Sequence, residues 1–248
     1  MSGGYQTVPF TSGPVQAQTL AIVEIIAHRG ASRDCPENTI VAFERARDLG
    51  ADAIELDVHL TADGELVVHH DAIPHSAPTP ALEGRPIRSL TLAELAHFRV
   101  RGEPIPTLKE VMQRVGGDLY VYCELKGAGT AIAAAALLTN PKWRVAVHSF
   151  DHRMIAESRR VSPTLTRGVL QASYPVAPVA AMVSANARDL WETADLIDAP
   201  LVAAAHNRGG RLIAWTVDSV AEMERLASLQ VDGICTNDVS LAKQVLRS

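Results

Sequence analysis

Aromatic side chains are scarce in this sequence, at 4% of 248 residues, although 47% of the residues are hydrophobic. Ala, Val, Leu and Ile therefore supply most of the apolar content, which favours parallel strands covered by Ala-rich helices over an all-β sandwich. The length is close to that of one (β/α)8 barrel, although it would also allow two small domains. Charged residues make up 21%, and such a composition argues against extended disorder.

The sequence also has too few cysteines for a disulfide-bonded or structural zinc protein and too little positive charge for a general nucleic-acid-binding protein. The three cysteines, Cys35, Cys123 and Cys235, are odd in number and lack CxxC spacing, which argues against a disulfide framework or a structural zinc site and fits a reducing compartment. The formal net charge is −5, whereas a general nucleic-acid-binding protein has a basic surplus. We therefore expect no nucleic-acid partner, and a phosphate site would have to be local and would need a metal ion.

The sequence contains no hydrophobic run long enough to cross a membrane. Residues 20–27 are apolar, but Glu24 interrupts them and the run is too short to span a bilayer. No Lys or Arg precedes Arg29, whereas a secretory signal begins with basic residues. We expect a soluble, cytoplasmic protein in which residues 1–19 form a flexible extension and residues 20–248 form a single domain.

Strand-like and helix-like segments alternate along this domain, which predicts parallel strands joined by right-handed crossovers in a TIM barrel, (β/α)8. Strands are expected at residues 22–27, 53–59, 66–70, 119–124, 143–150, 165–170, 212–217 and 233–235, and helices at 37–49, 106–115, 128–138, 151–160, 200–207, 220–229 and the C-terminus. Residues 72–104, rich in Pro and Gly, are an excursion from the barrel with a short helix at 91–98. Residues 171–197 should contain one helix and one strand, although their periodicity is weak.

Polar residues occur where several predicted strands end, and the active sites of such barrels lie at the carboxyl ends of the strands. Residues i and i+2 of a strand share a face, so Glu55 points the same way as Asp57, and Glu124 the same way as Lys126. Three carboxylates at one barrel mouth would repel each other without a cation between them. Oxygen ligands favour Mg²⁺ or Ca²⁺ as that cation.

Basic and titratable side chains accompany these carboxylates. Arg29 and Lys126 supply the positive charge that a phosphate needs, and His28 and His70 can give and take protons near neutral pH. In phosphodiester cleavage a metal ion offsets the charge of the phosphoryl oxygens. One histidine then acts as a base on the attacking hydroxyl or water, while the other protonates the leaving alkoxide. The residues therefore predict a metal-dependent phosphodiesterase.

An ordered series of motifs supports this prediction. It consists of Ala27-His28-Arg29-Gly30, Pro36-Glu37-Asn38-Thr39, residues 50–58 with Glu55-Leu56-Asp57, and Val67-Val68-His69-His70-Asp71, followed by shorter matches at 105–108, 124–126, 149–150, 215–218 and 231–234. In this series the sequence resembles the glycerophosphodiester phosphodiesterase family over roughly residues 22–240. The resemblance implies a (β/α)8 barrel with a small insertion after the second barrel strand, for which residues 72–104 are short.

The resemblance also implies a reaction and a set of site residues. Members of the family hydrolyse glycerophosphodiesters to glycerol 3-phosphate and an alcohol, with Ca²⁺ or Mg²⁺. The implied acid–base histidines are His28 and His70, the metal carboxylates are Glu55, Asp57 and Glu124, the phosphate contacts are Arg29 and Lys126, and Trp215 lies against the glycerol.

The sequence departs from the family pattern at three places. Thr236-Asn237-Asp238-Val239 stands where members often have Thr-Asp and then Pro, and Ala72 follows His-Asp where Pro is frequent. Residues 171–197 resemble the family poorly. These departures leave the predicted catalytic core intact, but they leave the headgroup specificity open.

Several neighbouring residues also have structural interpretations. Asn38 is expected to cap the helix that follows it, since its side chain can accept from free backbone N–H groups. Asp71 is expected to stabilise a turn rather than to orient His70, and His59 and His69 are expected to pack. Glu37 could equally reach the site or remain outside it.

Other functions remain open from the sequence. A lysophospholipase D or sphingomyelinase D-like phosphodiesterase on the same barrel would need apolar surface around the mouth, and the insertion has no long amphipathic stretch. A metal-independent phospholipase, or a barrel that only binds phosphodiesters, would have lost carboxylates or histidines that are present here. The oligomeric state, the choice between Mg²⁺ and Ca²⁺, and the attacking group also stay open, although analogy favours the glycerol 2-hydroxyl over direct attack by water.

Overall fold

The computed structural model describes residues 22–247, and the extension expected at residues 1–19 lies outside the described residues. A closed sheet of eight parallel strands forms the centre of the described chain, because β1 pairs with both β2 and β11. The barrel strands are β1 (Glu24–His28), β2 (Ala53–Leu60), β6 (Tyr120–Leu125), β7 (Arg144–His148), β8 (Thr166–Gln171), β9 (Asp189–Thr193), β10 (Arg211–Trp215) and β11 (Gly233–Thr236).

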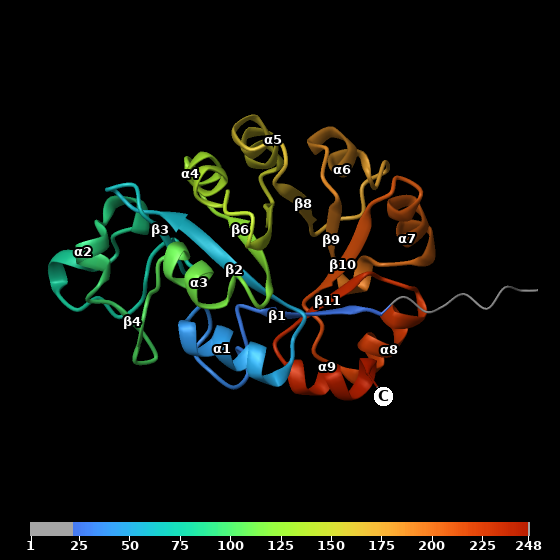
Figure 1. Cartoon of the computed structure of the whole chain (residues 1–248), viewed down its shortest axis with the longest axis horizontal. Coiled ribbons are helices and arrows are strands. Elements are labelled where there is room, and N and C mark those ends of the chain that lie inside the picture. Colours follow the sequence, from blue (N-terminus) through green and yellow to red (C-terminus); the bar gives the residue numbers. More distant parts are fainter. Residues whose placement is uncertain (1–21, 248) are drawn as a thin grey trace, which may run out of the picture.

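Helices surround these strands, and the prediction of a (β/α)8 TIM barrel is confirmed. Figure 1 shows α4 to α7 along one side of the barrel and α1, α8 and α9 along the other. The helices are α1 (Ile40–Leu49), α3 (Leu108–Val115), α4 (Thr130–Leu137), α5 (His152–Val161), α6 (Ala180–Ala185), α7 (Ala199–His206), α8 (Val220–Ser228) and α9 (Val239–Leu246). Residues 171–197 contain one helix and one barrel strand, as expected, together with the short η3 (Ala194–Leu196).

The first helix begins later than the sequence pattern suggests. Thr39 is its N-cap, because the Thr39 hydroxyl accepts from the backbone N–H of Ala42. The prediction that Asn38 caps this helix is therefore wrong. Asn38 is buried with a left-handed φ of 57°, and its side chain turns toward β2.

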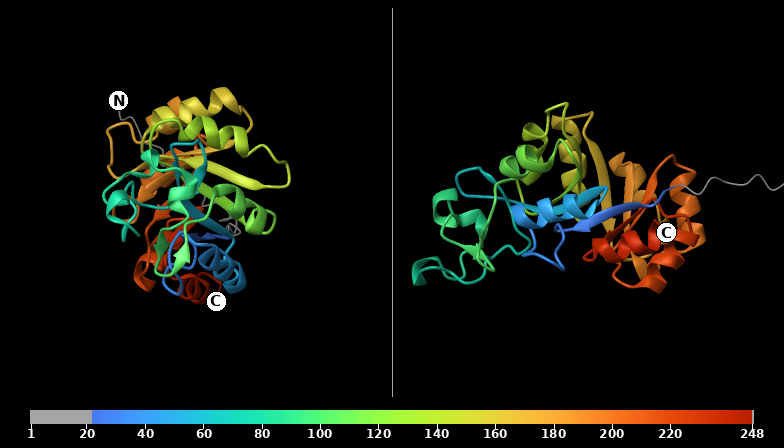
Figure 2. Two further views of the ribbon diagram at one scale, coloured as in Figure 1. Left: turned by 90° about the vertical axis from the view of Figure 1, so that its left-hand side faces the viewer. Right: turned by 60° about the horizontal axis from the view of Figure 1, so that its bottom comes forward.

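The insertion after β2 extends beyond one end of the barrel (Figures 1 and 2). It begins with β3 (Leu66–Val68), which pairs antiparallel with the end of β2 and is not a barrel strand. The rest contains η1 (Pro80–Leu82), η2 (Ile87–Ser89), α2 (Leu92–Leu95), β4 (Arg99–Val100) and β5 (Glu103–Pro104). A small core of its own stabilises it, formed by Val67, Ile87, Leu90, Leu95 and Phe98.

Alternation along each strand separates two apolar layers. On β2, Ile54, Leu56 and Val58 pack outward against the helices, whereas Ala53 belongs to the barrel interior. The interior also contains Tyr122 and Trp191, two of the largest fully buried side chains. The floor of the barrel is therefore filled by side chains, and the polar residues lie at the carboxyl ends of the strands.

A hydrogen-bonded group closes the opposite end of the barrel. The Tyr122 hydroxyl donates to Glu24 at 2.8 Å and accepts from Arg211 at 2.9 Å. Burial and the neighbouring Glu24 carboxylate raise the pKa of Tyr122. This phenol therefore stays protonated and serves to join strands rather than to transfer protons.

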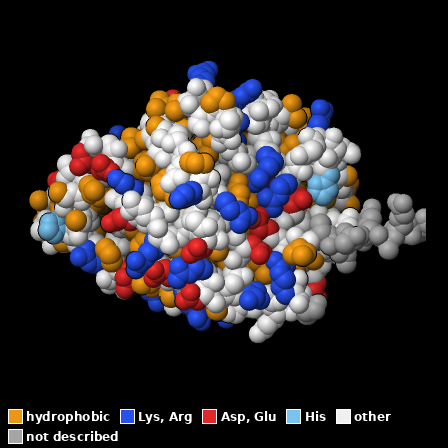
Figure 3. All heavy atoms as spheres, in the orientation of Figure 1, with side chains coloured by type: hydrophobic (Ala, Val, Ile, Leu, Met, Phe, Trp, Pro, Cys, Tyr) orange, Lys and Arg blue, Asp and Glu red, His pale blue; other side chains and the backbone are white. Residues whose placement is uncertain are grey.

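The described surface is mixed in charge. Figure 3 shows basic and acidic side chains interspersed over one face, without a single basic tract. Among residues 22–247, no helix combines the length and the apolar character that a bilayer crossing requires.

Candidate active site

The residues predicted for the site meet at the carboxyl end of the barrel. One small pocket of about 80 Å³ is lined by seven of the eight predicted site residues, which are His28, Arg29, Glu55, His70, Glu124, Lys126 and Trp215. Asp57, the eighth, contacts Arg29 and Lys126 from behind. They come from β1, β2, β6, β10 and the loop that follows β3, so the barrel fold gathers positions as distant as residues 28 and 215.

The imidazole of His28 is oriented by a chain of hydrogen bonds. Asn237 donates its side-chain Nδ2 to Asp218 at 2.6 Å and its backbone N–H to the same carboxylate at 2.8 Å. This arrangement turns Oδ1 of Asn237 toward His28 Nδ1, at 2.8 Å, so Nδ1 carries the proton and donates it to the amide oxygen. Nε2 of His28 is left as the acceptor, 4.0 Å from Glu55 Oε2.

The second histidine is held by a carboxylate. His70 Nδ1 donates to Asp71 Oδ1 at 2.7 Å, and His75 donates to the other oxygen of Asp71 at 2.8 Å. The expectation that Asp71 stabilises a turn rather than orients His70 is therefore wrong. His59 does not line the pocket; its Nε2 donates to the backbone carbonyl of His70 at 3.1 Å, which steadies the loop.

Asp57 lies between the two basic side chains. Its Oδ1 is 3.0 Å from Lys126 Nζ, and its Oδ2 is 3.2 Å from Arg29 Nε and accepts from Asn38 at 2.8 Å. Burial acts to raise the pKa of Asp57, but the charges of Lys126 and Arg29 outweigh burial and hold this pKa below its ordinary value. Asp57 is therefore ionised, and it fixes the two cations that face the pocket.

Glu37 takes part only at the edge of this group. Its carboxylate pairs with Arg29 at 3.0 Å and is 43% exposed, so it braces the guanidinium from the solvent side. The backbone of Arg29 is also constrained: its φ is 57°, and its N–H donates to Glu55 Oε2 at 3.2 Å.

Glu55, Glu124 and His148 form a cluster of possible metal ligands. One ligand atom from each lies within 4.8 Å of the others, and all three residues are buried. Burial and the nearby Asp57 charge raise the pKa of Glu55 to about 7, and burial with the same charge raises the pKa of Glu124 to about 7. Burial lowers the pKa of His148 to about 4, so its imidazole is neutral.

This donor set fits a divalent cation. Two crowded carboxylates favour ionisation only when a cation offsets their repulsion. In the described part of the chain, neither ring nitrogen of His148 has a hydrogen-bond partner. Asp57 forms ion pairs with Arg29 and Lys126, but its Oδ1 makes no hydrogen bond within the described residues, and its role as a ligand stays a prediction.

His148, Asn237 and Asp218 also belong to the site, although the sequence motifs did not predict them. His148 is the last residue of β7, and a polar residue at the carboxyl end of a barrel strand was the available signal. Asn237 was noticed only as a departure from the family pattern. Its contact with Asp218 spans 19 positions and is set by the pairing of β10 with β11.

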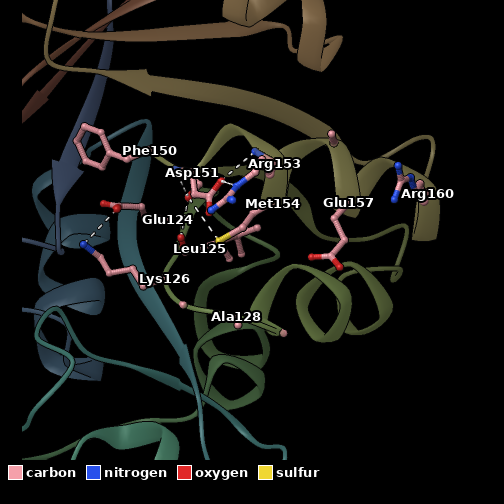
Figure 4. Close-up of a pocket in the computed structure, with 14 residues that line it drawn as sticks. Glu124, Leu125, Lys126, Ala128, Phe150, Asp151, Arg153, Met154, Glu157 and Arg160 are labelled. Atoms are coloured by element: carbon pink, nitrogen blue, oxygen red, sulfur yellow. Dashed lines mark hydrogen bonds and ion pairs between the residues drawn. The ribbon is translucent and has the colours of Figure 1, made fainter.

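A larger groove of about 880 Å³ shares Glu124, Lys126 and Phe150 with this pocket and lies between the loop that follows β6 and α5. Figure 4 shows Glu124 and Lys126 near one end of the groove and Arg160 at the other. Phe150 borders both cavities, and its ring contacts Trp215 edge to face at 5.4 Å between ring centroids. The site therefore has a narrow polar centre, an aromatic wall and an open channel beside it.

Comparisons with known proteins agree with this geometry. Residues 28–241 match the model of the glycerophosphoryl diester phosphodiesterase family. A glycerophosphodiester phosphodiesterase of Caldanaerobacter subterraneus subsp. tengcongensis is 37% identical over 86% of this chain and 93% of its own. The crystal structure of a glycerophosphodiester phosphodiesterase from Parabacteroides distasonis is 26% identical, covers 92% of this chain and 98% of its own, and has a TM-score of 0.79.

A second solved structure shows likeness in fold. It is an Oleispira antarctica phosphodiesterase in complex with the product sn-glycerol-3-phosphate, with a TM-score of 0.82 and 23% identity over 92% of this chain and 98% of its own. The family match spans more than half of the chain, and the Caldanaerobacter relative is similar over nearly its whole length. The chain therefore belongs to the glycerophosphoryl diester phosphodiesterase family.

Proposed function

We propose that this protein hydrolyses glycerophosphodiesters to glycerol 3-phosphate and an alcohol, with a divalent cation and with His28 and His70 as the acid–base pair. The observation that carries the proposal is that both histidines line one pocket with two cations and two buried carboxylates. In each histidine an oxygen acceptor engages Nδ1, so Nε2 remains for proton transfer. The names of the relatives in the same family support the choice of substrate.

The charge of the site supports the proposed need for a cation. Arg29 and Lys126 contribute two positive charges, whereas Glu37, Glu55, Asp57 and Glu124 contribute up to four negative ones. An ionised site would be too negative to bind an anionic diester. A bound divalent cation would offset this surplus and the charge of the phosphoryl oxygens.

The two cations would then bind the diester. Arg29 and Lys126 each have a side chain that is 19% exposed, so both are mostly desolvated and still reach the pocket. Asp57 holds them in place, and a charge-assisted hydrogen bond to a phosphate is stronger in such a site than in water. These side chains position the phosphorus near the Nε2 atoms of the two histidines.

Proton transfer follows from this arrangement. One histidine takes the proton of the glycerol 2-hydroxyl as its oxygen attacks phosphorus. The other gives a proton to the departing alkoxide as the bond from phosphorus to that oxygen breaks. Water then opens the five-membered cyclic phosphate with the two roles reversed, which breaks the bond to the 2-oxygen and leaves glycerol 3-phosphate.

The leaving alcohol would lie in the groove between the loop after β6 and α5. Glu124 and Lys126 lie near one end of this groove (Figure 4), and its volume of about 880 Å³ gives room for a polar headgroup. Trp215 and Phe150 offer an apolar wall for the carbon atoms of the glycerol. The cysteines at 35, 123 and 235 are free thiols, which supports our proposal that the enzyme acts in the cytoplasm, in lipid and glycerol metabolism.

The test is release of glycerol 3-phosphate from glycerophosphocholine, with EDTA and after Mg²⁺ or Ca²⁺ is restored. We expect release that EDTA abolishes and metal restores. The His28→Ala variant, purified in parallel, is the control for contaminating phosphodiesterases. Absence of release with every metal would overturn the proposal, and equal turnover of a lysophospholipid would favour a lysophospholipase D instead.

A further inference from the structure

His148 is buried in the barrel interior without a hydrogen-bond partner among residues 22–247. Its exposure is 1%, and neither Nδ1 nor Nε2 makes a hydrogen bond within the described chain. Buried polar groups are nearly always hydrogen-bonded, because loss of hydration is otherwise uncompensated. An apolar ring would fill this position at a lower free-energy cost if packing were the only role of the residue.

The ring of His148 is held in one orientation. It stacks on Trp191 with 4.4 Å between ring centroids and an interplanar angle of 28°, and Trp191 in turn meets Tyr122 edge to face at 5.0 Å. The side chain therefore cannot readily rotate to find another partner. Its Nε2 is directed toward Glu55 Oε1, 3.8 Å away.

That separation suits two ligands of the same ion. A distance of 3.8 Å is too long for a hydrogen bond. Two donors that are each about 2.0–2.2 Å from one metal ion lie about 3–4 Å apart, depending on the angle between them. Glu124 offers a third ligand atom in the same cluster, within 4.8 Å of the other two. His148 is the nitrogen donor of this cluster.

We propose that His148 is a nitrogen ligand of the catalytic cation, and that it shifts the preference of the site from Ca²⁺ toward Mn²⁺ and other transition-metal ions. This inference rests on the proposed metal-dependent function. Ca²⁺ takes six to eight oxygen ligands, whereas first-row transition-metal ions also accept an imidazole nitrogen. A site of carboxylates with one imidazole therefore binds Mn²⁺ more tightly than Ca²⁺.

The test measures metal binding directly rather than turnover. The full-length protein is freed of metal, titrated with Mn²⁺ and with Ca²⁺ by calorimetry, and its Mn²⁺ complex is studied by electron spin echo envelope modulation for coupling to ¹⁴N. Two variants remove the nitrogen ligand: His148→Gln, and His148→Phe, which keeps a ring against Trp191. His69→Gln is the matched control, because His69 is also largely buried with an unbonded Nε2 but does not line the pocket.

We expect ¹⁴N coupling in the wild type and in His69→Gln, and its loss in both His148 variants. We also expect the Kd for Mn²⁺ to rise at least about tenfold in those variants, while the Kd for Ca²⁺ changes less than about threefold. Persistence of ¹⁴N coupling or of Mn²⁺ affinity in a folded His148 variant would overturn this inference alone. Failure of the wild type to bind Mn²⁺ or Ca²⁺ would overturn the metal dependence of the proposed function as well.

Discussion

Asp218 acts on His28 through Asn237. Replacement of Asp218 by Asn should slow catalysis while the binding of metal and substrate stays nearly unchanged. The Asp218 carboxylate accepts three hydrogen bonds: from the Thr236 hydroxyl at 2.9 Å, from the Asn237 backbone N–H at 2.8 Å and from Asn237 Nδ2 at 2.6 Å. A carboxylate can accept all three, because both of its oxygens act only as acceptors. This is what directs the amide oxygen of Asn237 toward His28.

The Asp218→Asn side chain has one oxygen and one NH₂ group, so it cannot serve all three donors. One of the two bonds from Asn237 is lost or becomes repulsive, and a hydrogen bond to a charged group contributes about 1.5–3 kcal/mol. The Asn237 amide is then free to turn its NH₂ toward His28 Nδ1. His28 would have to accept at Nδ1 and carry its proton on Nε2, where it could no longer take one from the substrate.

The size of the effect follows from the free energy that holds the correct tautomer. If the free-energy preference for the tautomer protonated at Nδ1 falls by about 2–3 kcal/mol, the population of the reactive tautomer becomes small and kcat falls about 30–150-fold. The KM and the metal affinity should change little, since Asp218 contacts neither the cations nor the carboxylates of the pocket. The effect should be smaller than that of losing the His28 imidazole itself.

The assay is steady-state turnover of glycerophosphocholine, together with ¹⁵N NMR of the histidine rings to identify the tautomer of His28. Asp48→Asn is the matched control, because Asp48 is an exposed aspartate of α1 whose side chain is 61% exposed. A kcat within threefold of wild type, with Nδ1 of His28 still protonated, would refute the reasoning. A fall in thermal stability without a change of tautomer would show that Asp218 acts on folding only.

The remaining predictions concern proton transfer, pH and backbone shape. His28→Ala and His70→Ala should each lower kcat at least about a thousandfold with unchanged circular dichroism, and a near-normal rate in either would contradict the acid–base assignment. Burial raises the pKa of Glu124 to about 7, so the folded state binds this proton more tightly than the unfolded chain. Without metal, the unfolding free energy of the wild type minus that of Glu124→Gln should decrease as pH rises from about 4.5 to 8. With a metal ion bound, this difference should increase with pH instead. An increase with pH in the absence of metal would contradict the prediction. Gly30→Ala should cost about 2 kcal/mol or more in urea denaturation, because φ is +82° and the new Cβ would lie 2.7 Å from the backbone of α1. Gly64→Ala is the control, because Gly64 has a φ of +85° but open space around the new Cβ, so this variant measures the backbone strain alone. Equal losses of unfolding free energy in the two variants would argue against a steric clash at Gly30.

The alternation of elements could be predicted because its signals are local. Apolar periodicity, Gly after helices and clustered turn residues all act within a few positions, and even residues 171–197 contain the expected helix and strand. Boundaries are less secure where two residues compete for one role. Asn38 and Thr39 are both good N-caps, and the choice falls on Thr39 because Asn38 is drawn away by a hydrogen bond to Asp57.

The site could be predicted only as far as its motifs reach. His28, His70 and Glu124 could be predicted because each lies at the end of a strand expected from the sequence and within a recognisable series. His148 belongs to no such series, and its significance depends on Glu55, which lies 93 positions away in the chain and 3.8 Å away in space. Contacts across the barrel interior depend on strand order and register, which single-strand patterns do not contain.

Glu55 and Asp57 show why a shared face does not imply a shared role. Strand alternation places both on the interior of β2, and the sequence alone treats them as equivalent ligands. Their surroundings separate them: burial raises the pKa of Glu55 to about 7, whereas at Asp57 burial is outweighed by the charges of Lys126 and Arg29, which lower its pKa. Glu55 is destabilised when it ionises, so a bound metal ion would stabilise it most. Asp57 is already paired with Lys126 and Arg29 and would have to give up these ion pairs to bind the metal ion. The electrostatics therefore distinguish two carboxylates that share one face of β2, and the role of each as a metal ligand stays a prediction.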